Sequence, residues 1–256
     1  MTDASVLLAQ LPGLAFAFVL VLGRVGCACM LLPGLGETEI PVQLRAGFAL
    51  ALTALLLPVL SLPGAPDNVL RAAALLLAEM GTGLWLGWLT RLVLLALPLA
   101  GQIASSMLGL ANVLQPDPAL GGQTTALSHM LGLAAPVVVL SSGLYVLPLS
   151  ALEGSYQIVP PGTWLPAADS ALGAAEAVGE CFAIAMRLAA PFVLGGIVWQ
   201  VALGLLSRLV PQLQVYFAAM PGQILGGVVL LALLFVHVVG AWLDYAAAAY
   251  AALPGL

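Results

Sequence analysis

The stretch G-Q-I-L-G-G-V-V-L-L-A-L-L-F-V-H-V-V-G-A-W-L, residues 222–243, decides the fold class of this chain. It contains a single His and no Asp, Glu, Lys or Arg. A helix that crosses a membrane needs about 20 consecutive, mostly apolar residues. The stretch is long enough to span a bilayer, and it predicts an integral membrane protein.

The rest of the chain is similarly apolar, with 62% hydrophobic and 7% charged residues among 256. The apolar runs fall at roughly 5–33, 42–62, 70–105, 127–152, 177–207 and 222–250. They predict six helices. Pro98 and Pro191 lie inside two runs, and a proline bends or ends a helix. We therefore expect an all-α polytopic protein with kinked helices and helical hairpins.

Four connections between the runs carry most of the polar residues. They fall at 33–45, 63–71, 111–128 and 153–176. Connections of this length are uncommon in compact bundles and are more often functional than idle.

The charge pattern excludes one class of partner. The net charge is −5, all six basic residues are Arg, and Lys is absent. No basic patch is therefore available to follow a phosphate backbone, and we expect no nucleic-acid partner. The Arg residues lie on alternating sides of the runs or inside them, so they leave the membrane orientation open.

Catalytic and metal-binding patterns are absent from the sequence. An enzyme needs a nucleophile and base, a carboxylate pair or a metal cluster at defined spacing. His129 and His237 are far apart and belong to no HExxH motif. The three Cys residues lie in apolar stretches without the spacing of a tetrahedral metal site. We expect no enzymatic activity, no cofactor and no metal.

Charged residues inside the apolar runs need partners, because an ionisable group in hydrocarbon costs several kcal/mol unless it pairs or faces water or protein. Glu79 and Arg91 are twelve residues apart, too far to pair on one straight helix. At least one of them should reach another helix or another subunit. The pairs Gly83-x-x-x-Gly87 and Gly222-x-x-x-Gly226 have the spacing that lets helices approach closely.

Two polar stretches with Gly and Pro carry a family resemblance. The first is M-L-G-L at 107–110, followed by D-P-A-L-G-G-Q at 117–123, and the second is G-L-L-S-R-L-V-P-Q-L-Q-V at 204–215, followed by Pro221. Together they resemble the FliR family of flagellar protein-export components, whose relatives serve in injectisome-type secretion. Matching residues extend over nearly the whole chain: Arg24, Pro33, Gly36, Pro41, Arg45, Glu79, Gly83, Gly87, Gly101, Ile103, the turn at 160–162, Arg187 and Pro191. Gln214 and Gln223 depart from the pattern, since the family often has Asn and Lys there.

The resemblance implies a single FliR-like export-gate domain over residues 1–256. It implies a non-enzymatic structural and gating subunit of the type III export channel, in a hetero-oligomer with FliP-like and FliQ-like subunits and an FlhB-like subunit outside. Exported unfolded proteins would pass through this channel. The implied location is the bacterial inner membrane at the flagellar basal body, where the helices need not all cross the bilayer.

The resemblance also implies that the loop at 107–122 plugs the closed channel. Its apolar members, which would exclude ions and water, are Met107, Leu108, Leu110, Val113 and Leu114. Pro116, Pro118, Gly121 and Gly122 would keep the loop from forming continuous helix. Asp117 is a further residue of the expected plug. The alternative is a loop that only joins two helices.

The residues that we expect at assembly contacts are Arg24, Glu79, Arg187, Arg208, Pro211, Gln212 and Pro221. Two prolines should interrupt the helix at 208–221 and free carbonyls, to which Arg208 and Gln212 on one face could donate. The alternative for this stretch is an exposed polar turn. The rival function is a stand-alone small-molecule or ion transporter, with Glu79, Arg91 and Arg187 along its substrate path.

Overall fold

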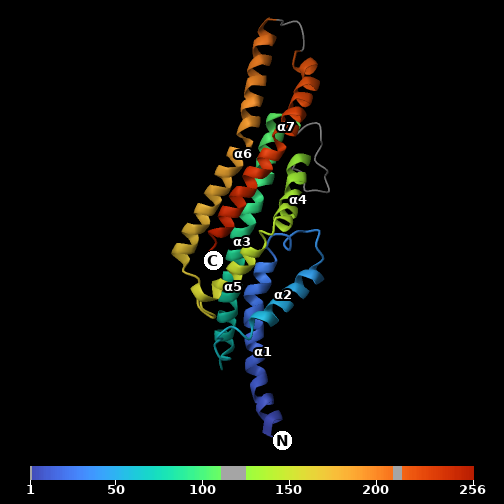
Figure 1. Ribbon diagram of the computed structural model, residues 1–256. Helices are drawn as coiled ribbons and strands as arrows, with labels where there is room; N and C mark the ends of the chain where they lie inside the picture. Colours follow the sequence, from blue (N-terminus) through green and yellow to red (C-terminus); the bar gives the residue numbers. More distant parts are fainter. Residues whose placement is uncertain (1, 111–124, 210–214) are drawn as a thin grey trace. The chain divides into compact units, whose positions relative to one another are not determined.

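The computed structural model describes residues 2–110, 125–209 and 215–256, and the described residues form helices and turns without a strand (Figure 1). The helices are α1 (Thr2–Cys29), α2 (Val42–Leu56), α3 (Val69–Met107), α4 (Ala126–Ser141), α5 (Val146–Ile158), α6 (Ala167–Leu209) and α7 (Val215–Ala251). The all-α prediction is confirmed.

The chain folds into two compact units. Unit 1 contains Met1–Leu92, Val139–Ala177 and Ala249–Leu256, and unit 2 contains Val93–Val138 and Val178–Ala248. The helices α3, α4, α6 and α7 each begin in one unit and end in the other. The units are therefore not consecutive stretches of chain, and the single-domain organisation stays a prediction.

Three long helices continue through prolines at which we expected a kink or a break. Pro98 lies inside α3, Pro191 inside α6 and Pro221 inside α7. The expectation of a break at these three residues is wrong, and the expectation of a kink stays a prediction. A proline removes only one backbone donor, and apolar surroundings offer the neighbouring backbone no better partner than the rest of its own helix.

The count of six helices is also corrected. The apolar run at 127–152 forms two helices, α4 and α5, which are bent by 74° relative to one another. Between them Gly143 adopts a φ of 78°, a conformation that favours glycine. The expected polar connection at 153–176 is mostly helical, because α5 continues to Ile158 and α6 begins at Ala167.

Four helices among the described residues are long and apolar enough to cross a membrane, or five if the bent pair α4–α5 counts as one span. They are Leu11–Cys29, Val69–Met107, Ala167–Leu209 and Ala218–Ala251. In α7 only 6% of the most apolar window is buried. The integral membrane class predicted from residues 222–243 is confirmed by these helices.

Each unit has a core in which an aromatic side chain of α7 meets α3. In unit 1 the buried Tyr250 hydroxyl donates to the Thr90 carbonyl at 3.3 Å. In unit 2 the buried Trp242 Nε1 donates to the Val93 carbonyl at 3.1 Å. Buried Trp and Tyr usually find such polar partners, which fix how the helices pack.

Candidate functional site

A buried ion pair between Arg24 of α1 and Glu79 of α3 lies in unit 1. Arg24 Nε donates to Glu79 Oε2 at 2.8 Å, and Arg24 Nη2 donates to Glu79 Oε1 at 3.1 Å. Both side chains are 0% exposed. A buried pair is stable only when its remaining donors and acceptors are satisfied.

Helix α5 and the turn after it complete the hydrogen bonding of this pair. Arg24 Nη1 donates to Ser155 Oγ at 3.2 Å, and Nη2 donates to the Val159 carbonyl at 2.9 Å. The Gly162 N–H donates to Glu79 Oε1 at 2.7 Å. We call these five residues the Arg24 cluster. It joins α1, α3, α5 and the turn at 160–162 through buried, charge-assisted bonds.

Close approach of α1 to α3 depends on two glycines. A Cβ on Gly83 would overlap the Arg24 carbonyl, and a Cβ on Gly87 would lie 3.0 Å from the Ala28 carbonyl oxygen. The sequence expectation for this Gly-x-x-x-Gly pair is confirmed. Without the close backbone contact, Arg24 would be displaced from the carboxylate that it pairs with.

The second Gly-x-x-x-Gly pair behaves differently. A Cβ on Gly222 would lie 3.4 Å from the Trp199 ring, but nothing lies within 4 Å of one on Gly226. The expectation is wrong for Gly226. Its neighbour Gly227 makes the close contact instead, since a Cβ there would lie 2.9 Å from Leu108 Cβ.

A second ion pair in unit 1 connects α3 to the segment between α1 and α2. Arg91 Nη1 and Nη2 donate to the two carboxylate oxygens of Glu37 at 2.5 and 3.0 Å, and the side chains are 27% and 16% exposed. Arg45 Nη2 donates to the carbonyls of Glu37 and Ile40. The prediction that Glu79 or Arg91 reaches another segment is confirmed for both, and the pairing is within the chain.

In unit 2, the described part of the predicted plug is the end of α3. The helix ends at Met107, and Gly109 has a φ of 72°. The Leu110 N–H donates to the Ser105 carbonyl at 3.0 Å. A left-handed glycine followed by a bond that reaches back five residues is the Schellman cap of a helix. The sequence at 107–110 therefore ends α3.

The three described plug residues contact unit 2 itself. Leu108 and Leu110 are only 4% and 6% exposed, whereas Met107 is 37% exposed. A Cβ on Gly196 would lie 3.0 Å from Met107 Cβ, so α6 passes close to the end of α3. Sealing of a channel by these side chains stays a prediction, and Met107 is the one of the three with an exposed side chain.

The start of α4 is bonded to α3 within unit 2. The Ser128 N–H donates to Thr125 Oγ1 at 3.3 Å, as at a helix N-cap. The Thr125 N–H donates to Gln102 Oε1 at 3.0 Å, and Thr125 Oγ1 lies 3.0 Å from Ser105 Oγ. Ser128 Oγ donates to the Pro98 carbonyl at 2.8 Å. The two helices are thus joined at the base of the segment between them.

The remaining predicted contact residues are separate from these clusters. Arg187 is exposed on α6, Arg208 is exposed in its last turn, and Pro221 is exposed on α7. Neither Arg has an ion-pair partner among the described residues. The predicted residues that lie outside the described ranges are Val113, Leu114, Asp117, Pro118, Pro211 and Gln212.

The sequence reasoning missed most partners of the predicted charges. It assigned no role to Ser155, Glu37 or Tyr156. The ring centroid of Tyr156 lies 4.1 Å from Arg24 Cζ, a distance typical of a cation–π contact. A signal was present, because a Ser-Tyr pair precedes a Pro-Pro-Gly turn that the resemblance had already marked. Ser155 and Tyr156 contact Arg24 across more than 130 positions of the sequence, and a contact over that separation has no local sequence signature.

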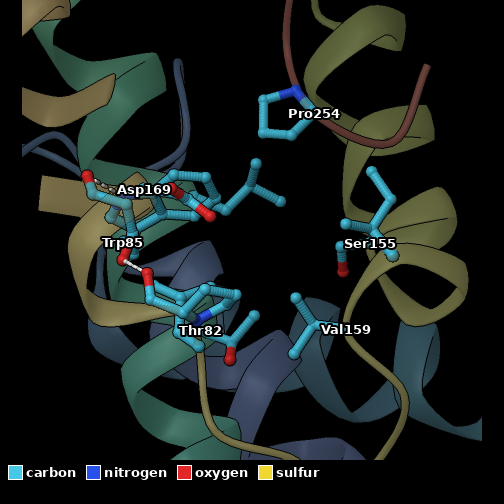
Figure 2. A pocket seen from close by; sticks show the side chains of 11 residues that line it. Thr82, Trp85, Ser155, Val159, Asp169 and Pro254 are labelled. Atoms are coloured by element: carbon cyan, nitrogen blue, oxygen red, sulfur yellow. Dashed lines mark hydrogen bonds between the residues drawn. The ribbon is translucent and has the colours of Figure 1, made fainter. Parts of the chain in front are cut away.

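A cavity of about 230 Å³ lies beside the Arg24 cluster in unit 1. Figure 2 shows Thr82, Trp85 and Asp169 on one side of it and Ser155 and Val159 on the other. Trp85 Nε1 donates to the Ser170 carbonyl at 3.2 Å. Of the described residues that line the cavity, only Asp169 has an ionisable side chain, and a single carboxylate supplies no acid–base pair.

Metal-binding geometry is likewise absent from the part of the chain that the structure describes, where no three His, Cys, Asp or Glu side chains gather closely enough to hold an ion. The Arg24 cluster, the Arg91–Glu37 pair and the bonds of Thr125 and Ser128 instead join helices and connecting segments to one another.

Comparison with known proteins gives a consistent relationship. Residues 15–249 match the family described as bacterial export proteins, family 1. The chain is 30% identical to the flagellar biosynthetic protein FliR of Caulobacter vibrioides, over 90% of this chain and 92% of that protein. It is 27% identical to the Bacillus subtilis protein of the same name, over 81% and 82% of the two chains. It is 28% identical to the Yop proteins translocation protein T of Yersinia pestis, over 80% of each. Because the family match covers residues 15–249, nearly all of the sequence, this chain belongs to the FliR family of bacterial export proteins.

Proposed function

We propose that this protein is a structural and gating subunit of a type III protein export channel, assembled with FliP-like and FliQ-like subunits to pass unfolded proteins. The family match over residues 15–249 carries the proposal. The proposal includes a location in the bacterial inner membrane at the flagellar basal body, an FlhB-like subunit as a further partner and no enzymatic role.

The exposed surface supports assembly with other apolar chains. Only 6% of the apolar window of α7 is buried, so this helix needs lipid or other helices around it. Arg187 is exposed on α6 and has no ion-pair partner among the described residues. A charge in that position is costly against lipid and much less so against a carboxylate or carbonyl of a neighbouring subunit. We therefore keep Arg187 and Arg208 as assembly contacts.

The segment at 107–122 is proposed to close the channel at rest. Apolar side chains without sequence preference suit a seal that must exclude ions yet admit many unfolded chains. The supporting geometry is at the base of the segment, where the Schellman cap of α3 and the N-cap of α4 both contact Ser105. The described residues on either side of the segment therefore lie close to one another at the end of α3.

The gating role is tested by deletion of residues 111–122, which spares Leu110, Thr125 and the contacts of both helix ends. We expect normal recovery of the FliP-like and FliQ-like subunits with the deleted protein, because the helices carry the packing surface. We also expect a raised resting ion leak, measured by electrophysiology and by uptake of a membrane-impermeant dye. A deleted form that assembles and stays as ion-tight as the parent would show that the segment is only a connector.

The stand-alone transporter has no support from the relatives, which are named as flagellar biosynthetic and translocation proteins. The transporter hypothesis placed Glu79, Arg91 and Arg187 along a substrate path. Two of them, Glu79 and Arg91, form ion pairs within the chain. Purification gives an independent check. An export subunit should be recovered with FliP-like and FliQ-like chains and be unstable without them, whereas a transporter should be stable alone.

A further inference from the structure

The cavity beside the Arg24 cluster is built entirely from residues of unit 1, so its walls are complete without a second chain. Its volume is about 230 Å³. Pockets for drug-sized ligands are larger, at about 300–1,000 Å³. The cavity reaches into the core of the unit, since Thr82 and Leu86 of α3 are each 1% exposed and Ser155 of α5 is 5% exposed. It therefore suits a small molecule with few heavy atoms.

The side-chain donors among the described residues of the cavity wall are all bonded within unit 1. The hydroxyls of Thr82, Ser155 and Ser170 each donate to a backbone carbonyl three or four positions earlier in the chain. Trp85 Nε1 donates to the Ser170 carbonyl at 3.2 Å. A hydroxyl that has given its only proton can still accept through its lone pairs. These side chains can therefore accept hydrogen bonds from a ligand, but they have no remaining proton to donate to it.

The only charge in the cavity wall is negative. Asp169 is exposed in the first turn of α6, and no ion-pair partner for it is found in the described part of the chain. The positive end of a helix dipole favours an anion, and here the Asp169 carboxylate itself supplies that anion. Lys is absent from the sequence, and no Arg lines the cavity. A positive charge to pair with Asp169 must therefore come from a ligand.

We propose that this cavity binds a small primary amine in its ammonium form, carried on a short alkyl or aryl stem. An ammonium has three N–H donors and no acceptor, so it matches walls whose side chains only accept. Figure 2 shows Thr82 and Asp169 on one side of the cavity and Ser155 and Val159 on the other, so acceptors lie on both sides. Leu86 and Val159 provide apolar surface for the stem. A carboxylate or phosphate ligand is disfavoured, because its charge has the same sign as that of Asp169.

The ligand is assigned as a free molecule because the cavity needs no second chain to complete it. A lysine side chain of a neighbouring subunit has the same chemistry, and the test separates the two. The proposal is independent of the export and gating roles proposed above, since it involves neither the segment at 107–122 nor the exposed Arg187 and Arg208.

The test uses the protein as solubilised from membranes, with the subunits that co-purify with it. The probes are n-pentylammonium, 1-pentanol and pentanoate, which have the same number of carbon atoms and differ in charge. Binding is measured by saturation-transfer NMR during titration of each probe. We expect n-pentylammonium to bind with a dissociation constant on the order of millimolar, 1-pentanol to bind more weakly and pentanoate not to bind. Added salt should weaken binding of n-pentylammonium but not of 1-pentanol.

Asp169→Asn is the central variant. It keeps the size of an exposed side chain and removes the charge, so it should weaken n-pentylammonium binding about fivefold and leave 1-pentanol unchanged. The matched control is Asp67→Asn, an exposed aspartate of unit 1 that does not line the cavity, which should change neither. Ile158→Trp places a larger side chain at a wall residue that is 59% exposed, and it should weaken both probes.

Three results would overturn the proposal. Binding of n-pentylammonium that Asp169→Asn leaves unchanged would place the amine elsewhere, and equal binding of pentanoate would show that the cavity does not select a cation. Absence of n-pentylammonium binding would also overturn it. Carbodiimide coupling then shows whether a lysine side chain occupies the cavity, because it would join the Asp169 carboxylate to a lysine of a neighbouring subunit. The export and gating proposals are unaffected by any of these results.

Discussion

The Arg24 cluster of unit 1 and the bonds that join Gln102, Ser105, Thr125 and Ser128 in unit 2 are both buried polar networks between helices, but they are built from different groups. We call the second network the Thr125 clasp. The first contains a guanidinium and a carboxylate, each 0% exposed. The second contains only hydroxyls, an amide and backbone groups. Charged networks are costly to open, whereas neutral networks open at the cost of a few ordinary hydrogen bonds. We therefore expect loss of one partner to cost more in unit 1 than in unit 2.

The energies explain why this difference matters. Removing one member of a buried ion pair costs about 3–5 kcal/mol, because the other charge stays buried without a partner. A single neutral hydrogen bond contributes about 1 kcal/mol net. The two networks therefore differ about threefold or more in the expected cost of removing one partner.

The largest effect is expected for Arg24→Met. The substitution keeps much of the apolar volume but leaves the Glu79 carboxylate buried with only the Gly162 N–H as a partner. We expect about 3–5 kcal/mol of destabilisation and near-complete loss of folded protein and complex, measured by recovery from membranes and thermal unfolding.

The double variant Arg24→Met/Glu79→Leu is the informative companion. It removes both charges, so it should recover much of the stability lost in Arg24→Met, as apolar replacement of buried pairs often does. If the single and double variants are equally unstable, the loss comes from packing of the α1–α3 contact. The stability lost in Arg24→Met would then not come from the unpaired Glu79 carboxylate.

The next largest effect is expected for Gly83→Ala. A Cβ at this position would overlap the Arg24 carbonyl, so α3 must move away from α1 and the ion pair must stretch. Overpacking of this kind costs about 1–3 kcal/mol, or more against rigid backbone. The control is Gly81→Ala on the same helix, where nothing lies within 4 Å and stability should be equal or higher. Equal thermal unfolding temperatures for the two variants would contradict the proposed close contact.

The fold class could be predicted because it depends on local composition. Runs of about 20 apolar residues indicate helices whatever lies around them. The errors fell where local signals were ambiguous. Pro98 and Pro191 were expected to kink their helices or to divide them into pairs, and the division is wrong because α3 and α6 continue through both residues. The bend between α4 and α5 was missed because the run at 127–152 is apolar on both sides of Gly143.

The candidate site could be predicted only in part, for a related reason. Arg24 and Glu79 stood out because a charge inside an apolar run needs a partner, and this need is a property of the residue itself. The identity of the partner depends on folding across 55 positions, for which the sequence has no periodicity. The hydroxyls of Ser105 and Thr125 gave no signal at all, since Ser and Thr are common in apolar helices and loops.

The smallest effect is expected for Gly227→Ala, which tests the contact between α7 and the end of α3 in unit 2. A Cβ on Gly227 would lie 2.9 Å from Leu108 Cβ, a side-chain atom that can shift by a few tenths of an ångström. We therefore expect only about 1 kcal/mol of destabilisation and a normal yield of complex. Because Leu108 belongs to the cap that ends α3, its displacement should raise the resting ion leak slightly. The matched control is Gly226→Ala, the neighbouring residue with nothing within 4 Å, which should leave both stability and leak unchanged. A leak that is equal in the two variants would mean that the position of Leu108 at the end of α3 has no effect on the proposed seal.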